Sequence, residues 1–123
     1  MLNILSVFLG GAIGSVLRYL ISLLSKKYFL TPVIGTFFVN IIGCFIIGLV
    51  FGLVLKSNVF PNFVRLFIIS GFLGGLTTFS SFNLEIFELI KEGKIFLSLA
   101  YLLLSLIFGL LSTYLGFILS GAK

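Results

Sequence analysis

The chain has 123 residues, of which 60% are hydrophobic and only 9% are charged. A water-soluble domain of this size exposes much surface and carries about 25% charged residues, so this composition excludes a soluble globular fold. The chain has no histidine, one cysteine and three acidic residues. These leave too few ligands for a zinc site and too few groups for acid–base catalysis.

Four apolar segments are each long enough to cross a bilayer, which takes about 20 helical residues. They cover residues 2–24, 33–55, 64–90 and 95–119. Pro32 and Pro61 both fall in the short gaps between segments, as expected of helix boundaries. The apolar run at 45–55 does not alternate with polar residues as a barrel strand would. The sequence therefore predicts a single all-α integral membrane domain in the cell membrane, with lipid around its four helices.

The first segment, residues 2–24, is expected to be a permanent helix. No basic residue precedes its apolar stretch, and Arg18 and Tyr19 stand where a signal peptide would need small residues for cleavage. Gly10 and Gly14 lie one turn apart, in the GxxxG spacing that lets helix backbones approach closely. We interpret these two glycines as packing residues.

The second segment carries an amide deep inside a span, Asn40. A buried amide needs a hydrogen-bond partner. Thr36, Asn40 and Gly43 share one helical face, so donors lie beside a small residue where another helix or a solute could approach. Two interpretations stay open, because Asn40 could line a solute pathway or form an ordinary hydrogen bond between helices.

The third segment has a cluster of helix-weakening residues in its middle. The cluster consists of Gly71, Gly74, Gly75, Thr77, Thr78, Ser80 and Ser81. Such residues favour an interruption of the helix near 74–81. A break at membrane depth frees backbone carbonyls that lipid cannot satisfy, so they must face protein, water or an ion. The alternative is a kinked, tightly packed helix whose hydroxyls bond back to the preceding turn.

The last segment has a polar stripe on one face. The stripe contains Tyr101, Ser105, Gly109 and then Ser112 or Thr113, at spacings of three or four residues. Residues at these spacings lie on one side of a helix. The stripe either lines a polar track or forms a packing seam.

The Lys and Arg residues do not fix an orientation in the membrane. One predicted side has Lys56, Arg65 and Lys123, and the other has Lys26, Lys27, Lys91 and Lys94, with Arg18 nearby. Such even counts allow insertion in both directions, and a chain that does so can pair with its inverted copy. We therefore predict an antiparallel, dual-topology homodimer. The basic residues form no single patch with interleaved aromatics, so we expect no nucleic acid partner.

The segments lack the ionisable groups of a coupled transporter. No Asp, Glu or His lies in the first, second or fourth segment, so no proton relay or cation-coupling carboxylate is predicted there. The remaining neutral donors and aromatic edges suit a small anion, because a Phe ring is electropositive at its edge. Phe79 and Phe82 share a helix face and could supply such edges, or they could be core residues.

Three blocks of the sequence resemble the signature blocks of the Fluc (CrcB-type) fluoride channels. They are GGAIGSVLRY at 10–19, GTFFVNIIGCF at 35–45 and GFLGGLTTFSSF at 71–82. The resemblance covers nearly the whole chain. It implies a passive, highly selective channel that exports fluoride across the cell membrane down its electrochemical gradient, with two antiparallel pathways in each dimer.

The resemblance also implies roles for individual residues. Phe79 and Phe82 would form an aromatic box around dehydrated fluoride, and Asn40 would donate to the ion. The carbonyls of Gly74 and Thr77 from both subunits would hold a structural sodium ion (Na+) at the dimer interface.

Further polar residues are expected along or near the pathway. The pathway would also include Thr36, Ser80, Tyr101, Ser105, Ser112 and Thr113. Arg18 would lie at a pore vestibule, where it would attract anions or anchor the fold. Glu85 would face a vestibule or stand at a solvated helix end.

Other functions stay open at this point. A small four-helix multidrug-type exporter can also be an antiparallel dimer, but it usually needs a membrane-embedded glutamate in its first span, where this chain has none. A membrane scaffold without transport would show no ion selectivity and would tolerate Asn40→Leu. An enzyme is disfavoured, since no nucleophile, base or metal set is apparent.

Overall fold

The structure is a computed structural model that describes residues 1–57 and 60–122. Its elements are α1 (Leu2–Phe29), α2 (Val33–Ser57), α3 (Asn62–Leu66), the π-helix η1 (Phe67–Leu73), α4 (Gly74–Leu76), α5 (Phe79–Lys91) and α6 (Ile95–Leu119). All regular structure in these residues is helical. Lys123, one of the charges that flank the helices, lies outside the described residues.

Four stretches of the described chain are long and apolar enough to cross a membrane. They are Leu2–Phe29, Val33–Lys56, Asn62–Lys91 and Ile95–Leu119. The prediction of an all-α chain with four membrane-length helices is therefore confirmed.

The first helix is longer than its apolar stretch. It continues past Leu24 to Phe29, and ends where Leu30 adopts a left-handed conformation (φ 61°) and donates its N–H to the Lys26 carbonyl at 3.1 Å. The predicted end of the helix near Leu24 rests on hydropathy alone. The helix extends further because a long basic side chain such as that of Lys26 can keep its charge in water while its backbone stays helical.

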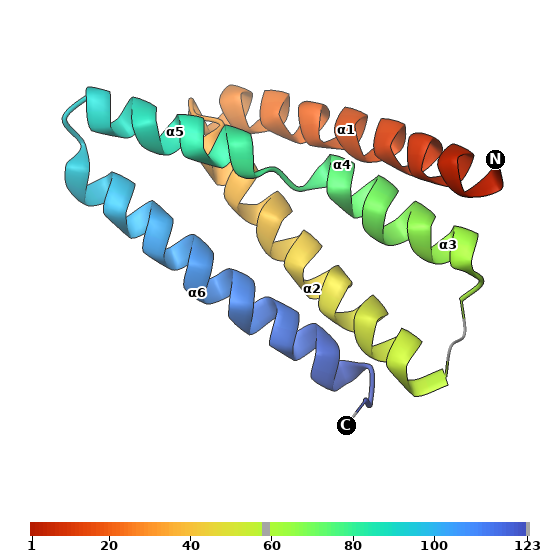
Figure 1. Ribbon diagram of the computed structural model, residues 1–123. Coiled ribbons are helices and arrows are strands. Elements are labelled where there is room, and N and C mark those ends of the chain that lie inside the picture. Colours follow the sequence, from red (N-terminus) through yellow and green to blue (C-terminus); the bar gives the residue numbers. More distant parts are fainter. Residues whose placement is uncertain (58–59, 123) are drawn as a thin grey trace.

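The helices are arranged as two pairs (Figure 1). α1 packs along η1 and α4, whereas α2 packs along α6. α5 connects the two pairs by packing on α6. The pairs lie close together at the end that holds the α1–α2 and α5–α6 connectors, and they diverge towards the end that holds both termini (Figure 1).

Glycines bring α1 into backbone contact with the third membrane-length helix. A Cβ atom on Gly10 would overlap the Phe67 carbonyl, and one on Gly14 would overlap the Phe72 carbonyl. From the opposite side, a Cβ atom on Gly75 would meet the Gly11 carbonyl. The packing role predicted for Gly10 and Gly14 is confirmed, and we call this contact between α1 and η1–α4 the glycine seam.

Few large side chains of the described residues are buried. One buried cluster contains Val39, Leu73 and Leu76, and the other contains Phe82, Leu89 and Tyr101. Most other large apolar side chains are exposed. Such a surface needs lipid or another protein chain to cover it.

Candidate functional site

Thr77 and Thr78 separate α4 from α5. Both have extended backbones, with φ −79° and ψ 154° at Thr77 and φ −150° and ψ 126° at Thr78. Thr78 also caps α5, because its hydroxyl accepts a hydrogen bond from the Ser81 N–H at 3.2 Å. These two residues form the break around which the other site residues gather.

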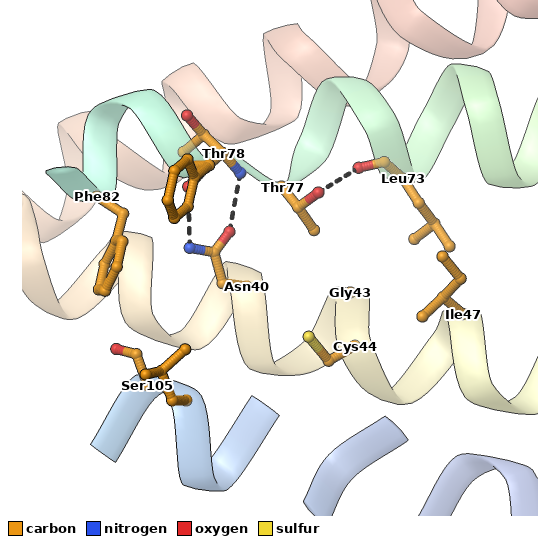
Figure 2. A pocket seen from close by; sticks show the side chains of 11 residues that line it. Asn40, Gly43, Cys44, Ile47, Leu73, Thr77, Thr78, Phe82 and Ser105 are labelled. Atoms are coloured by element: carbon orange, nitrogen blue, oxygen red, sulfur yellow. Dashed lines mark hydrogen bonds between the residues drawn. The ribbon is translucent and has the colours of Figure 1, made fainter. Parts of the chain in front are cut away.

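Asn40 binds the backbone of the break from α2. Its Oδ1 accepts from the Thr78 N–H at 2.8 Å, and its Nδ2 donates to the Thr78 carbonyl at 3.1 Å (Figure 2). The Asn40 amide thus connects α2 to the residue that caps α5, in agreement with the interpretation that Asn40 forms a hydrogen bond between helices. An NH2 group has two hydrogens and the Thr78 carbonyl accepts one of them, so Asn40 keeps a second donor that could serve a solute.

The break also changes what the nearby carbonyls can bind. In a continuous helix the Gly74 carbonyl would accept from the Thr78 N–H and the Thr77 carbonyl from the Ser81 N–H. Here the first N–H is donated to Asn40 and the second to the Thr78 hydroxyl. No hydrogen bond to either carbonyl is present among the described residues.

These two carbonyls, which have no donor among the described residues, could bind a cation. No group of three His, Cys, Asp or Glu side chains that could hold a metal occurs in the described part of the chain. Carbonyl oxygens of unwound helices are suitable ligands for Na+. The carbonyls of Gly74 and Thr77 therefore fit the sodium site that the resemblance implies, with oxygen ligands that come from the backbone alone.

A cavity of about 300 Å³ lies beside the break. Asn40, Cys44, Thr77, Phe82 and Ser105 are among its lining residues (Figure 2). The Ser105 hydroxyl is buried and has no hydrogen-bond partner among the described residues. A buried polar group without a partner costs free energy, so Ser105, one of the lining residues, has an unused hydrogen-bonding group.

The two phenylalanines of the predicted box differ in burial. Phe82 is 5% exposed and meets Tyr101 edge-on, with ring centroids 4.9 Å apart. Phe79 is 77% exposed, and its ring lies 6.1 Å from that of Phe82. Both line the cavity, so the structure brings them together there, one fixed by packing and the other largely uncovered.

Glu85 is not at a solvated helix end, and that interpretation of the sequence was wrong. Its side chain is 6% exposed. It accepts hydrogen bonds from the Thr36 hydroxyl at 2.6 Å and from the Tyr101 hydroxyl at 2.8 Å. α5 continues to Lys91, so Glu85 lies well inside the helix. A carboxylate needs donors when buried, and these two hydroxyls, both predicted as pathway residues, supply them.

The remaining predicted residues, Ser80, Ser112 and Thr113, do not line the cavity. Ser80 is exposed, with its hydroxyl 3.3 Å from that of Thr78. On α6, the Thr113 hydroxyl donates to the Gly109 carbonyl of its own helix at 3.1 Å, and Ser112 is half-buried beside it.

Arg18 lies at the glycine seam. Its Nε donates to the Gly75 carbonyl at 3.0 Å, next to the break. Sequence reasoning did not find this contact or the contacts of Glu85, although it named all of the side chains involved.

The sequence matches the family model described as "CrcB-like protein, Camphor Resistance (CrcB)" over residues 5–117. The chain belongs to this family. It is 45% identical over 120 residues to a fluoride-specific ion channel FluC of Azobacteroides pseudotrichonymphae, which covers 96% of this chain and 95% of the relative. Proteins of the same name from Gloeothece citriformis (47% over 117 residues) and Aquifex aeolicus (46% over 118 residues) each align over 94% of both chains.

Membership of the CrcB-like family confirms the resemblance found in the three sequence blocks. The family is one of ion channels rather than enzymes. With its four membrane-length helices, the chain is a multi-pass membrane protein.

Proposed function

We propose that the chain is a passive, selective fluoride channel through which fluoride leaves the cell down its electrochemical gradient. The observation that carries this proposal is the cavity beside the break. Asn40, Ser105 and Phe82 line one space there. The Asn40 amide has a second N–H besides the one donated to Thr78, and the Ser105 hydroxyl has no hydrogen-bond partner among the described residues. The names of the relatives, fluoride-specific ion channel, support the same function.

The chemistry of this cavity favours a small anion over a cation. Hydroxyl and amide hydrogens donate to an anion, and aromatic ring edges are electropositive. No acidic side chain lines the cavity, and both oxygens of the nearby Glu85 are already hydrogen-bonded. Dehydrating an unpaired ion costs on the order of tens of kcal/mol in the Born limit, so these donors and edges must replace its water.

Export needs no coupled energy source. A membrane potential is worth about 2.3 kcal/mol per charge per 100 mV, so an inside-negative cell drives the anion outwards. α1, α2 and α6 contain no acidic residue. Glu85, which is buried in α5, does not line the cavity and has both carboxylate oxygens hydrogen-bonded, which agrees with passive conduction rather than coupled export.

We further infer that two copies assemble antiparallel and form two pathways. Between the diverging helix pairs the protomer has an apolar hollow of about 530 Å³, lined by residues such as Phe51, Tyr114 and Phe117. Phe79 is also uncovered at the cavity. A second, inverted copy would cover both surfaces, and the even distribution of Lys and Arg permits that orientation. In this arrangement the break lies at membrane depth, within the span Asn62–Lys91.

The carbonyls of Gly74 and Thr77 would hold the structural sodium ion in this dimer. Bound there, the ion would supply positive charge to the unpaired carbonyls of both copies. In a continuous helix these two carbonyls would accept from the N–H groups of Thr78 and Ser81. Those N–H groups are instead donated to Asn40 and to the Thr78 hydroxyl, which supports this assignment.

Within each pathway, we assign the closest ion contacts to Phe79, Phe82, Asn40 and Ser105, because all four line the cavity. Tyr101 and Thr36 act beside it, through the hydroxyls that they donate to Glu85. Ser80, Ser112 and Thr113 would continue the polar surface towards the two ends.

The decisive experiment measures efflux from liposomes that contain the purified protein and are loaded with fluoride or chloride. A potassium ionophore carries the balancing charge. Rapid fluoride release without chloride release is the expected result. If folded, dimeric protein releases neither ion, the channel proposal is wrong and a scaffold role replaces it.

A further inference from the structure

The contact between Arg18 and the break follows from the geometry of the glycine seam. Gly10, Gly14 and Arg18 are spaced four residues apart, so they share one face of α1. The two glycines place this face directly against the backbone of η1 and α4. Arg18 is the next residue on the same face and reaches the Gly75 carbonyl.

The Gly75 carbonyl lies in the last turn of a helical stretch. That stretch runs without interruption from Asn62 to Leu76 through α3, η1 and α4. Carbonyls of the last turn have no donor within their own helix, and they lie at the negative end of its dipole. A guanidinium N–H gives such a carbonyl a charge-assisted hydrogen bond, which is stronger than a neutral one. Arg18 provides it at 3.0 Å from a half-buried position.

Two side chains therefore hold the backbone on the two sides of Thr77. Arg18 from α1 binds the carbonyl of Gly75, and Asn40 from α2 binds the N–H and the carbonyl of Thr78. The residues between these two attachments include Thr77, whose carbonyl has no helix donor. Phe79, the first residue of α5, follows directly after the second attachment.

We propose that Arg18 is a positioning residue of the channel. Its Nε–H holds the Gly75 carbonyl and so fixes the end of α4, from which the extended Thr77 and Thr78 lead into α5 and its two phenylalanines. This role depends on a donor at one position of the side chain, and not on a positive charge that attracts anions. The inference rests on the proposed fluoride function.

Three substitutions at this position separate the donor from the charge. Arg18→Gln places an amide nitrogen at the same number of bonds from Cα as the arginine Nε, and it removes the charge. Arg18→Lys keeps a positive charge but places a carbon atom at that position. Arg18→Met places a methyl carbon there and has neither donor nor charge.

Fluoride efflux per reconstituted dimer is the first readout. We expect Arg18→Met and Arg18→Lys to slow efflux roughly tenfold or more, as for a lost hydrogen bond to a charged group, whereas Arg18→Gln stays within about threefold of the unsubstituted chain. Rescue by glutamine distinguishes positioning from attraction of anions. If lysine preserves efflux and glutamine abolishes it, the charge matters instead and the inference is wrong.

The second readout observes the carbonyl itself and needs no fluoride. Labelling glycine carbonyl carbons with ¹³C and leucine nitrogens with ¹⁵N selects the four Gly–Leu pairs, at 48–49, 52–53, 75–76 and 109–110. In solid-state NMR of the protein in bilayers, the Gly75 signal should move to lower frequency in Arg18→Met and Arg18→Lys, and less so in Arg18→Gln. An unmoved Gly75 signal in all three variants would overturn the inference.

The two readouts distinguish a failure of the inference from a failure of the proposed function. If the unsubstituted chain conducts no fluoride, the channel function is wrong, and the positioning role falls with it even when the Gly75 signal moves. If the unsubstituted chain conducts fluoride but the order of glutamine and lysine is reversed, only the positioning role is wrong. Should Arg18→Met fail to fold, the glutamine and lysine variants still decide the question.

Discussion

The two halves of the third membrane-length helix are held in different ways. Before the break, from Asn62 to Leu76, the helix lies backbone against backbone on α1 along the glycine seam. After the break, α5 is held by side chains, as in the hydrogen bonds from Thr36 and Tyr101 to Glu85. The first half has almost no room to adjust, whereas the second depends on a few polar and aromatic contacts. Cavity-lining residues come from both halves and from the break between them.

The largest effect should come from closing the space in the glycine seam. In Gly14→Ala the new Cβ would overlap the Phe72 carbonyl and the Leu76 nitrogen, and backbone atoms cannot move aside easily. We expect a loss of about 1–3 kcal/mol or more in the free energy of unfolding, as for other overpacked sites. Thermal unfolding of the detergent-solubilised protein measures this loss.

Gly11→Ala is the matched control for that substitution. The nearest atom to its Cβ would be the Gly71 carbonyl oxygen at 3.9 Å, an ordinary contact distance. Alanine favours helix over glycine by up to about 1 kcal/mol, so this variant should be as stable as the unsubstituted chain or slightly more stable. Equal stabilities of the Gly14→Ala and Gly11→Ala variants would contradict the claim that the glycine seam has no room for a side chain at Gly14.

In the half after the break, the largest loss of stability should come from removing the buried hydrogen-bond acceptor Glu85. Glu85→Leu leaves the hydroxyls of Thr36 and Tyr101 without the carboxylate that they now bind. Each buried unpaired donor costs about 1–3 kcal/mol, although some of this cost is relieved if a hydroxyl rotates to another acceptor. The unfolding free energy of the variant measures the loss.

A double-mutant cycle tests whether these contacts are the cause. Adding Thr36→Val to Glu85→Leu removes one of the two hydroxyls that lack an acceptor. The double variant should recover part of the lost stability, because replacing both hydrogen-bond partners by apolar groups is nearly neutral. Strictly additive losses would mean that the hydrogen bond from Thr36 to Glu85 contributes nothing.

The sequence predicted the helices well because the thickness of a membrane fixes their length. Glycine, threonine and serine weaken helices, and the stretch that the sequence singled out for this reason contains the extended Thr77 and Thr78. The surroundings of Glu85 could not be predicted in the same way. Two extended residues, Thr77 and Thr78, rotate α5 relative to the helix before it, so the helical period cannot be carried across the break. The partners of Glu85 also come from two other helices.

Similarly, the sequence named Arg18 and Asn40 but not their partners. Both side chains bind backbone atoms of the break, and a backbone carbonyl or N–H has no signature in the sequence. Only the distance between α1 and α4, set by the glycine seam, determines that Arg18 reaches Gly75.

Phe79 and Phe82 differ in burial, so the same substitution should affect stability differently at the two positions. Phe82→Ile should lose the edge contact with Tyr101, worth about 0.5–1.5 kcal/mol beyond burial, whereas Phe79→Ile should cost the protomer little because its ring is 77% exposed. Both variants should slow fluoride efflux roughly tenfold or more, the factor that corresponds to about 1.4 kcal/mol of lost ion stabilisation. Unchanged efflux in both would remove the aromatic box from the proposal.

The smallest effect is expected outside both halves, at the connector between α5 and α6. Glu92 and Lys94 form an ion pair at 2.7 Å with side chains 56% and 57% exposed. Exposed pairs of this kind are worth about 0–1 kcal/mol, so Glu92→Ala should barely change the unfolding free energy or fluoride efflux. Any small loss should vanish at about 1 M salt, where charges are screened within about 3 Å. A loss that persists in high salt would mean that the connector is held by packing, as the helix before the break is, and not by charge.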